Sequence, residues 1–574
     1  MTVDAAGPSA TDLRRIVADA EFGLTAGGAR QPSISLPGDD AVVVGRTVAA
    51  AAASVSLGLA LTGTVIHAPG FPDLASVPIT FADQVPAVRR QLERRLGHDG
   101  VDLLFGLVNA TTAALTRSPT AAAAEMAVRG MLAVEAWDSR LAWRRNEPEL
   151  AAHLDGGARR PNPMTEPPDG AGERYANRAG VAGAAAAALL GVLSGNVQTA
   201  GAAALTAPPK PLRACREAFG FRLGQGLTIH HDALVLRPRV LRTLDRLDAV
   251  VIDPRALHTG ELTVSRVVGV QNSKRTHAWE AVRAALENDG LTPGWHRLST
   301  IPKAGRSGKT LISHVRDPFA TAVVTEARRS HSRVVSVDDD GLRSLAKGFD
   351  YLFPLGDSVD EALAAAVAEL KADGGAIGLL TTPDLRAAHN ADVTIGLVRP
   401  GQFPWGADVF VPDLRAVWRI FHALPAARAA TTRGIRLSAS ASAIGALMLI
   451  PGVVGRGPES VNAGVAAGLW AGYSAGNKVF RDALPDPEPG HDWHTLPVDE
   501  LLRVLPRPPD EQRRERSAGW RELPPVRGAR TAIAGSWHLA TDFGGEMRAN
   551  LSDPITPLLA TGAMASALLG SPLD

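Results

Sequence analysis

Apolar residues gather in long runs near the start of the chain. Val48–Ile66 contains nineteen residues without a charged side chain. A helix needs ~20 residues to cross ~30 Å of hydrocarbon, so this run predicts a membrane segment, although a buried helix of a soluble domain gives the same pattern. Residues 180–206 form a second, alanine-rich run. Asn196 and Gln198 within it favour a short hairpin, or a helix packed inside a bundle, over one straight span.

Two further apolar runs, Ile435–Val454 and Val461–Ala475, follow the middle of the chain. A turn containing proline and glycine separates them, so they are predicted to form a helical hairpin. With Val48–Ile66 and Val181–Thr206 they make up the predicted membrane-embedded segments. Helices suit that environment because they satisfy their own backbone hydrogen bonds in lipid.

Between the apolar runs the pattern changes to short buried strands separated by helices. The predicted strands are Asp248–Asp253, Arg333–Val337 and Ala376–Leu380. Helical periodicity covers Asp317–Ser330 and Ser358–Asp373. Strands that alternate with helices along the chain predict a parallel α/β sheet.

Composition and the N-terminal sequence add four observations. The net charge of +1, with scattered basic residues, gives no reason to expect a nucleic acid or an acidic partner. The single cysteine, Cys215, excludes a disulfide framework and predicts a small buried thiol. Met1–Ala20 lacks the basic and apolar regions of a signal peptide. Abundant alanine and glycine suit closely packed membrane helices.

The first predicted strand ends in an aspartate, Asp253, followed by P-R-A-L-H-T. This order resembles the phosphorylation segment of the cation-transporting P-type ATPases, whose pattern is D-K-T-G-T-L-T. In that family the aspartate is the nucleophile that accepts phosphate. By resemblance, Asp253 takes the nucleophile position and Thr259 that of the last threonine. Pro254 and Ala256 replace the lysine and the glycine, and a proline lacks a backbone N–H donor, so the resemblance implies a broken loop.

Further matches follow in the family's order. Asp317 and the next proline resemble its D-P-x-R segment, Asp340 the last residue of its T-G-D motif, and Asp392 its A-D-V-G-I-A segment. Thr381 and Thr382 stand about where the family has a Mg²⁺-binding acid. Magnesium in phosphoryl transfer is held by carboxylates, so the resemblance implies that Mg²⁺ and ATP belong to the family but not to this chain.

Two modules of the family are not apparent in the sequence. The actuator domain carries a T-G-E motif well before the phosphorylated aspartate, whereas the TGE at Thr259–Glu261 follows Asp253 and is predicted to be the tail of the degenerate loop. Only about fifty residues separate Thr259 from Arg316, where the family inserts a large nucleotide-binding domain.

Two short motifs have plainer interpretations. Lys303–Thr310, KAGRSGKT, resembles a P-loop but has a lysine at the first glycine position and no clear strand before it. We interpret it as a solvated basic loop. His230, His231 and Asp232 could ligate a metal, but no third ligand has suitable spacing, and we interpret them as a turn before a strand.

The last segment, Phe543–Asp574, resembles the first membrane hairpin of the transport core in double-length members of the family. The resemblance implies a degenerate unit followed by the start of a catalytic one. Because the apolar part of this segment is short, we expect it to pack only when a second half supplies the remaining helices. The expected divisions are a polar segment 1–40, a helical region with the first membrane segment 41–158, a membrane hairpin 174–210, a phosphorylation domain 211–400, a helical membrane hairpin 401–480, a Pro/Arg-rich linker 481–542 and the start of the second unit 543–574.

The predicted fold class is therefore α/β plus membrane helices, with a degenerate HAD-like parallel sheet flanked by Ala/Gly-rich hairpins. The resemblance implies a non-catalytic, regulatory or structural half of a metal-ion pump, lying in the plasma membrane with residues 210–400 in the cytoplasm. Its partners would be the catalytic half and the lipid bilayer. Two alternatives stay open: a HAD-like phosphohydrolase using Asp253, and a membrane scaffold without a ligand. Arg255 stands where such a hydrolase usually has its second acid.

Overall fold

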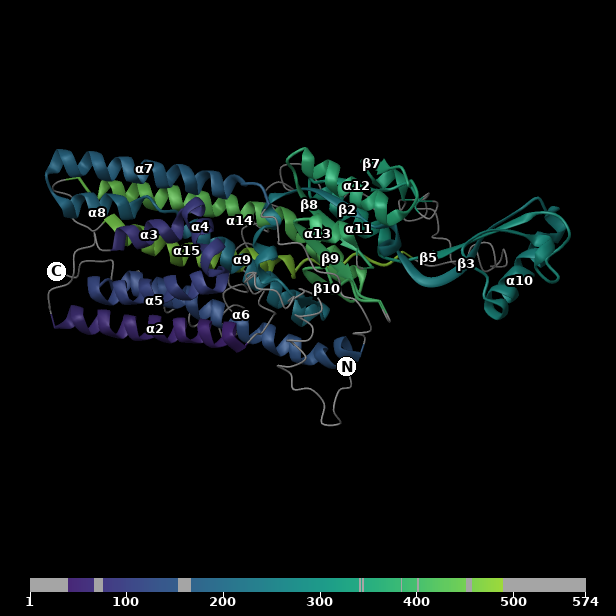
Figure 1. Ribbon diagram of the computed structural model, residues 1–574, viewed down its shortest axis with the longest axis horizontal. Coiled ribbons are helices and arrows are strands. Elements are labelled where there is room, and N and C mark those ends of the chain that lie inside the picture. Colours follow the sequence, from purple (N-terminus) through teal and green to yellow (C-terminus); the bar gives the residue numbers. More distant parts are fainter. Residues whose placement is uncertain are drawn as a thin grey trace, which may run out of the picture. The chain divides into compact units, whose positions relative to one another are not determined.

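The computed structural model describes residues 40–66, 76–152, 167–339, 342, 345–383, 385–399, 402–450 and 457–488. They form two compact units (Figure 1). One unit contains the described residues up to His258 together with Phe319–Asp486, and the other is centred on Thr259–Pro318. Asp340, most of the linker 481–542 and the segment Phe543–Asp574 lie outside the described residues.

Long helices make up most of the first unit. They are α2 (Asp40–Val65), α3 (Val77–Gln84), α4 (Pro86–Leu96), α5 (His98–Thr116), α6 (Pro119–Ala152), α7 (Ala171–Ser194), α8 (Val197–Thr206), α9 (Lys210–His231), α14 (Leu414–Leu447) and α15 (Gly457–Val479). Helix α2 packs against α5 and α6, and α9 packs against α14 and α15. Figure 1 shows α7 and α14 running side by side, in agreement with their contacts.

Two of the described helices, α2 over Ala41–Val65 and α7, are long and apolar enough to cross a membrane. Their mean hydropathies are 1.7 and 1.4. Both leave large apolar side chains exposed, such as Val55 on α2 and Val192 on α7. The predicted segment Val181–Thr206 is broken at Asn196, whose side chain accepts a hydrogen bond from the backbone N–H of Gln198 at 2.8 Å and begins α8. The hairpin of α14 and α15 is present, and its place in a membrane stays a prediction.

The same unit contains a seven-stranded mixed sheet with the order β1-β10-β9-β8-β2-β6-β7. Its strands are β1 (Leu234–Val235), β2 (Leu247–Ile252), β6 (Arg333–Val337), β7 (Tyr351–Phe353), β8 (Ala376–Thr381), β9 (Val393–Leu397) and β10 (Val409–Val411). All neighbours are parallel except β1, which pairs antiparallel with β10 at one edge. The predicted strands β2, β6 and β8 are present almost at their predicted bounds.

Helices cover both faces of this sheet, which explains why its central strands read as continuous apolar runs. Val250 and Ile252 of β2 pack into a core shared with α9, α11 (Ala320–Arg329) and α14. Ala249 and Val251 face the other way, into a core with α12 (Val359–Ala372) and α13 (Arg386–Asn390). The alternation buries every residue of β2 except Asp248.

The second unit interrupts the stretch 211–400, which the sequence had suggested to be one domain. It contains a three-stranded sheet in the order β3-β5-β4, built from β3 (His258–Val268), β4 (Gly294–Arg297) and β5 (Lys309–Arg316), and the helix α10 (Asn272–Asp289). Val264, Val282, Leu298 and Ile312 are buried in a core of its own. This separate core is the physical reason that the insertion forms a unit of its own.

Candidate functional site

The parallel sheet places Asp253 directly after the last residue of β2, at the carboxyl edge of the central strand. Its side chain is fully buried, and its backbone N–H donates to the carbonyl of Leu380 at 2.9 Å. Asp253 also begins the short 3₁₀ helix Pro254–Leu257, because its Oδ1 accepts a hydrogen bond from the backbone N–H of Arg255 at 2.9 Å. The local P-R-A-L sequence therefore forms an ordered turn around the carboxylate.

The guanidinium of Arg255 covers both oxygens of this carboxylate. Nε of Arg255 donates to Oδ1 of Asp253 at 2.9 Å, and Nη2 donates to Oδ2 at 2.9 Å. The hydroxyl of Thr381 also donates to Oδ2, at 3.2 Å. Nη2 of Arg255 reaches a second carboxylate, Oδ1 of Asp360, at 2.7 Å. A bidentate arginine–carboxylate pair of this kind is the strong form of such a contact.

The surroundings of Arg255 favour its protonated form. Burial lowers the pKa of Arg255, but the hydrogen bonds and the charge of Asp253, together with those of Asp360, bring the pKa above its usual value. A carboxylate whose oxygens all face a cation and a hydroxyl has little electron density to offer an electrophile. In this arrangement Asp253 is a partner in an ion pair rather than an exposed nucleophile.

Among the described residues, those in contact with Asp253 do not fit the magnesium ion that phosphoryl transfer requires. Mg²⁺ is bound through carboxylate oxygens, and here the available carboxylate already contacts a guanidinium. Thr381 and Thr382, both buried, supply hydroxyls where a second acid would be needed. Within the described residues no group of three or more histidine, cysteine, aspartate or glutamate side chains could hold a metal ion.

The other residues suggested by the sequence belong to different parts of the chain. Asp392 precedes β9 and accepts hydrogen bonds from the N–H of Ile377 at 2.8 Å and from Lys371 at 3.0 Å. Because parallel strands run in one direction, it lies at the opposite edge of the sheet. Thr259 lies in the second unit, where its hydroxyl donates to the carbonyl of Val315 at 3.2 Å. Asp317 follows β5 in that unit, and Asp340 lies outside the described residues.

The two short motifs match their plainer interpretations only in part, since His230 and His231 are still helical and Thr310 is buried in β5. Lys303–Thr310 leads into β5 rather than into a helix, and the hydroxyl of Thr310 donates to the carbonyl of Arg266 at 3.1 Å. His230 and His231 end α9 beside the ring of Phe480. Cys215 is buried, and its thiol donates to a carbonyl of α14.

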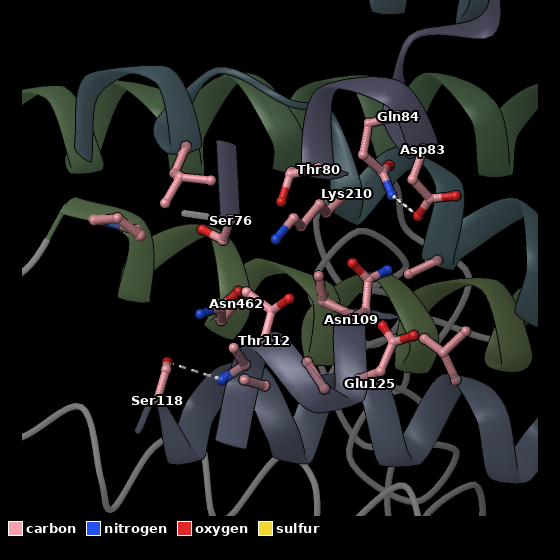
Figure 2. A pocket seen from close by; sticks show the side chains of 18 of the residues that line it. Ser76, Thr80, Asp83, Gln84, Asn109, Thr112, Ser118, Glu125, Lys210 and Asn462 are labelled. Atoms are coloured by element: carbon pink, nitrogen blue, oxygen red, sulfur yellow. Dashed lines mark hydrogen bonds between the residues drawn. The ribbon is translucent and has the colours of Figure 1, made fainter. Parts of the chain in front are cut away.

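A second candidate site, which the sequence analysis missed, is a cavity of about 130 Å³ among α3, α5, α6, α9 and α15. Figure 2 shows its polar lining, with Lys210, Thr80 and Asn109 around the hollow. No local pattern in the sequence marks this cavity, because its lining comes from helices far apart in the chain.

Three carboxylates line this cavity, and each of them forms an ion pair with an arginine. Asp83 pairs with Arg213 at 2.7 Å and also with Arg89. Glu125 pairs with Arg129 at 2.7 Å. The third, Glu217, pairs with Arg242. These acids therefore do not form an open set of ligands for a cation.

The curated relatives of the chain are cation-transporting ATPases. The chain is 28% identical over 94% of its length to "Probable cation-transporting ATPase I" of Mycobacterium leprae, and 28% identical over 94% to the protein of that name in Mycobacterium tuberculosis. It covers 39% and 38% of those proteins, so it spans about two fifths of the length of the curated relatives it matches. No protein-family model matches the chain.

The solved structures similar to the chain include P-type ATPases. Two crystal structures of a zinc-transporting PIB-type ATPase, each in a different state, align with 77% of this chain and 100% of that one. Their sequence identities are 11% and 12%, and the TM-score is 0.47 for both.

Proposed function

We propose that this chain is a non-catalytic half of a cation-transporting P-type ATPase, regulatory or structural for an ATP-driven metal-ion pump. Its sheet would be a degenerate HAD-like phosphorylation domain with Asp253 at the place of the phosphorylated aspartate. The observation that carries the proposal is the Arg255 guanidinium bound to both oxygens of that carboxylate. The chain would act beside the catalytic half of the pump, fused or separate.

Incubation of the purified chain with labelled ATP and Mg²⁺ is expected to give no acid-stable phosphoenzyme. The reason is that both oxygens of the Asp253 carboxylate are occupied by Arg255. Acid precipitation and scintillation counting measure the result, with a catalytic P-type ATPase processed in parallel to show that the assay works.

The variant Asp253→Asn separates the alternatives in the same preparation. Label on the wild-type chain that disappears in Asp253→Asn would contradict the proposal. Mg²⁺-dependent hydrolysis of a small phosphomonoester that is lost in Asp253→Asn would favour a phosphohydrolase. A scaffold without a ligand would neither incorporate phosphate nor bind nucleotide.

We further propose that the chain is a multi-pass protein of the plasma membrane, with the seven-stranded sheet in the cytoplasm. The exposed apolar side chains of α2 and α7 favour this location, because lipid would cover them. Carbonate extraction followed by ultracentrifugation is expected to leave the full chain in the membrane pellet. Recovery of the chain in the supernatant would contradict a spanning location.

A further inference from the structure

The cavity among α3, α5, α6, α9 and α15 contains a lysine, Lys210, which is the first residue of α9. Figure 2 shows its side chain extending into the hollow, toward Ser76 and away from Asp83. Among the described residues no carboxylate lies within ion-pair distance of its ammonium group. Charged groups inside a protein are normally paired, so this ammonium calls for a partner beyond the described residues.

The acids of the cavity are poor candidates for that partner, because arginines already hold them. Asp83 contacts Arg213 and Arg89, and Glu125 contacts Arg129. Lys210 is the charged lining group that has no ion-pair partner among the described residues. An unpaired ammonium disfavours a metal cation and favours an anion.

Two neutral side chains add hydrogen-bonding capacity beside the ammonium. The hydroxyl of Thr80, on α3, and the carboxamide of Asn109, on α5, line the cavity and have no hydrogen-bond partner among the described residues. Other lining groups are engaged: the hydroxyl of Thr112 donates to the carbonyl of Val108 at 2.7 Å, and Nδ2 of Asn462 donates to Thr120. An ammonium, a hydroxyl and a carboxamide N–H together form a donor set for one small acceptor.

We propose that the cavity binds a small inorganic anion, from chloride up to an oxyanion the size of phosphate, through Lys210, Thr80 and Asn109. The volume of about 130 Å³ is well above the ~10–15 Å³ that one water requires, so the cavity has room for a small anion. The anion neutralises Lys210 and lets α3, α5 and α9 close on a balanced set of charges. Binding is independent of Asp253 and ATP, so it can be tested whether or not the chain accepts phosphate.

The test is thermal unfolding of the full chain in detergent, with chloride or sulfate replacing gluconate at constant ionic strength. Gluconate, a larger organic anion, serves as the reference. The wild-type chain is expected to show a saturable rise in Tm of about 2 °C once the anion exceeds its Kd roughly a hundredfold. The variant Lys210→Met should lose this rise. Lys478→Met, the same substitution at an exposed lysine of α15, should keep it.

A change of fold in Lys210→Met would also abolish the response to the anion. Two further measurements distinguish this from a loss of binding. In gluconate, Lys210→Met should unfold at a higher temperature than the wild type, because it removes an uncompensated charge. Thr80→Val, which keeps the ammonium and the shape of the side chain, should raise the Kd for the anion about tenfold, since it removes one hydrogen bond. An equal response to chloride in wild type and Lys210→Met would overturn the proposal. So would a wild-type Tm that depends on neither anion, or a saturable response to a metal cation that Glu125→Gln abolishes.

Discussion

Replacing Arg255 by methionine is expected to destabilise the unit that contains the seven-stranded sheet by about 3 kcal/mol. The substitution removes both side-chain donors to Asp253, leaving a fully buried carboxylate with only the Thr381 hydroxyl and one backbone N–H. Breaking a buried ion pair by removing one partner costs ~3–5 kcal/mol. The lower value applies because the side chain of Arg255 is 39% exposed, and solvent screens part of the interaction.

Two further variants isolate the pair. Asp253→Asn combined with Arg255→Met leaves no charge unpaired, so the double variant should recover most of the lost stability. Asp360→Asn should cost only about 0.5 kcal/mol, because Asp360 is 57% exposed. Thermal unfolding of the full chain, followed by tryptophan fluorescence, measures all of them. A loss in Arg255→Met no larger than that in Asp360→Asn would show that Asp253 does not depend on the arginine.

The strands of the large sheet could be predicted because a strand covered on both faces is apolar throughout its length. β2, β6 and β8 therefore stood out as short apolar runs between helices. The position of Asp253 at the carboxyl edge followed from the same pattern. The local sequence also placed Arg255 two residues later, but it could not show that the guanidinium folds back onto the carboxylate.

The remainder of the site depends on contacts between residues far apart in the sequence. Asp360 reaches Arg255 only because α12 packs over β2, and the cavity combines residues of α3, α5, α6, α9 and α15. Helix length was underestimated for a related reason. The predicted segment began at Ile435, whereas α14 begins at Leu414, since its first half is buried against the sheet rather than marked by a continuous apolar run.

The close approach of α9 and α15 gives the second large expected effect, at Gly472. Glycines occupy every fourth position of α15 at Gly464, Gly468, Gly472 and Gly476, so they form one face of the helix. That face packs against the backbone of α9. A Cβ added at Gly472 would overlap the carbonyl oxygen of Cys215 and lie 2.8 Å from its carbonyl carbon. Small residues at every fourth position allow helices to approach this closely.

Gly472→Ala is therefore expected to destabilise the chain by about 3 kcal/mol, because backbone rather than a flexible side chain stands in the way of the new methyl group. Gly58→Ala on α2 is the matched control. It makes the same change in another helix where no heavy atom lies within 4 Å of the added Cβ. Since alanine favours a helix over glycine by up to about 1 kcal/mol, Gly58→Ala should leave stability unchanged or slightly raised. Thermal unfolding of the two variants in the same detergent measures the difference. Equal midpoints would mean that α9 and α15 are not packed backbone to backbone at Gly472.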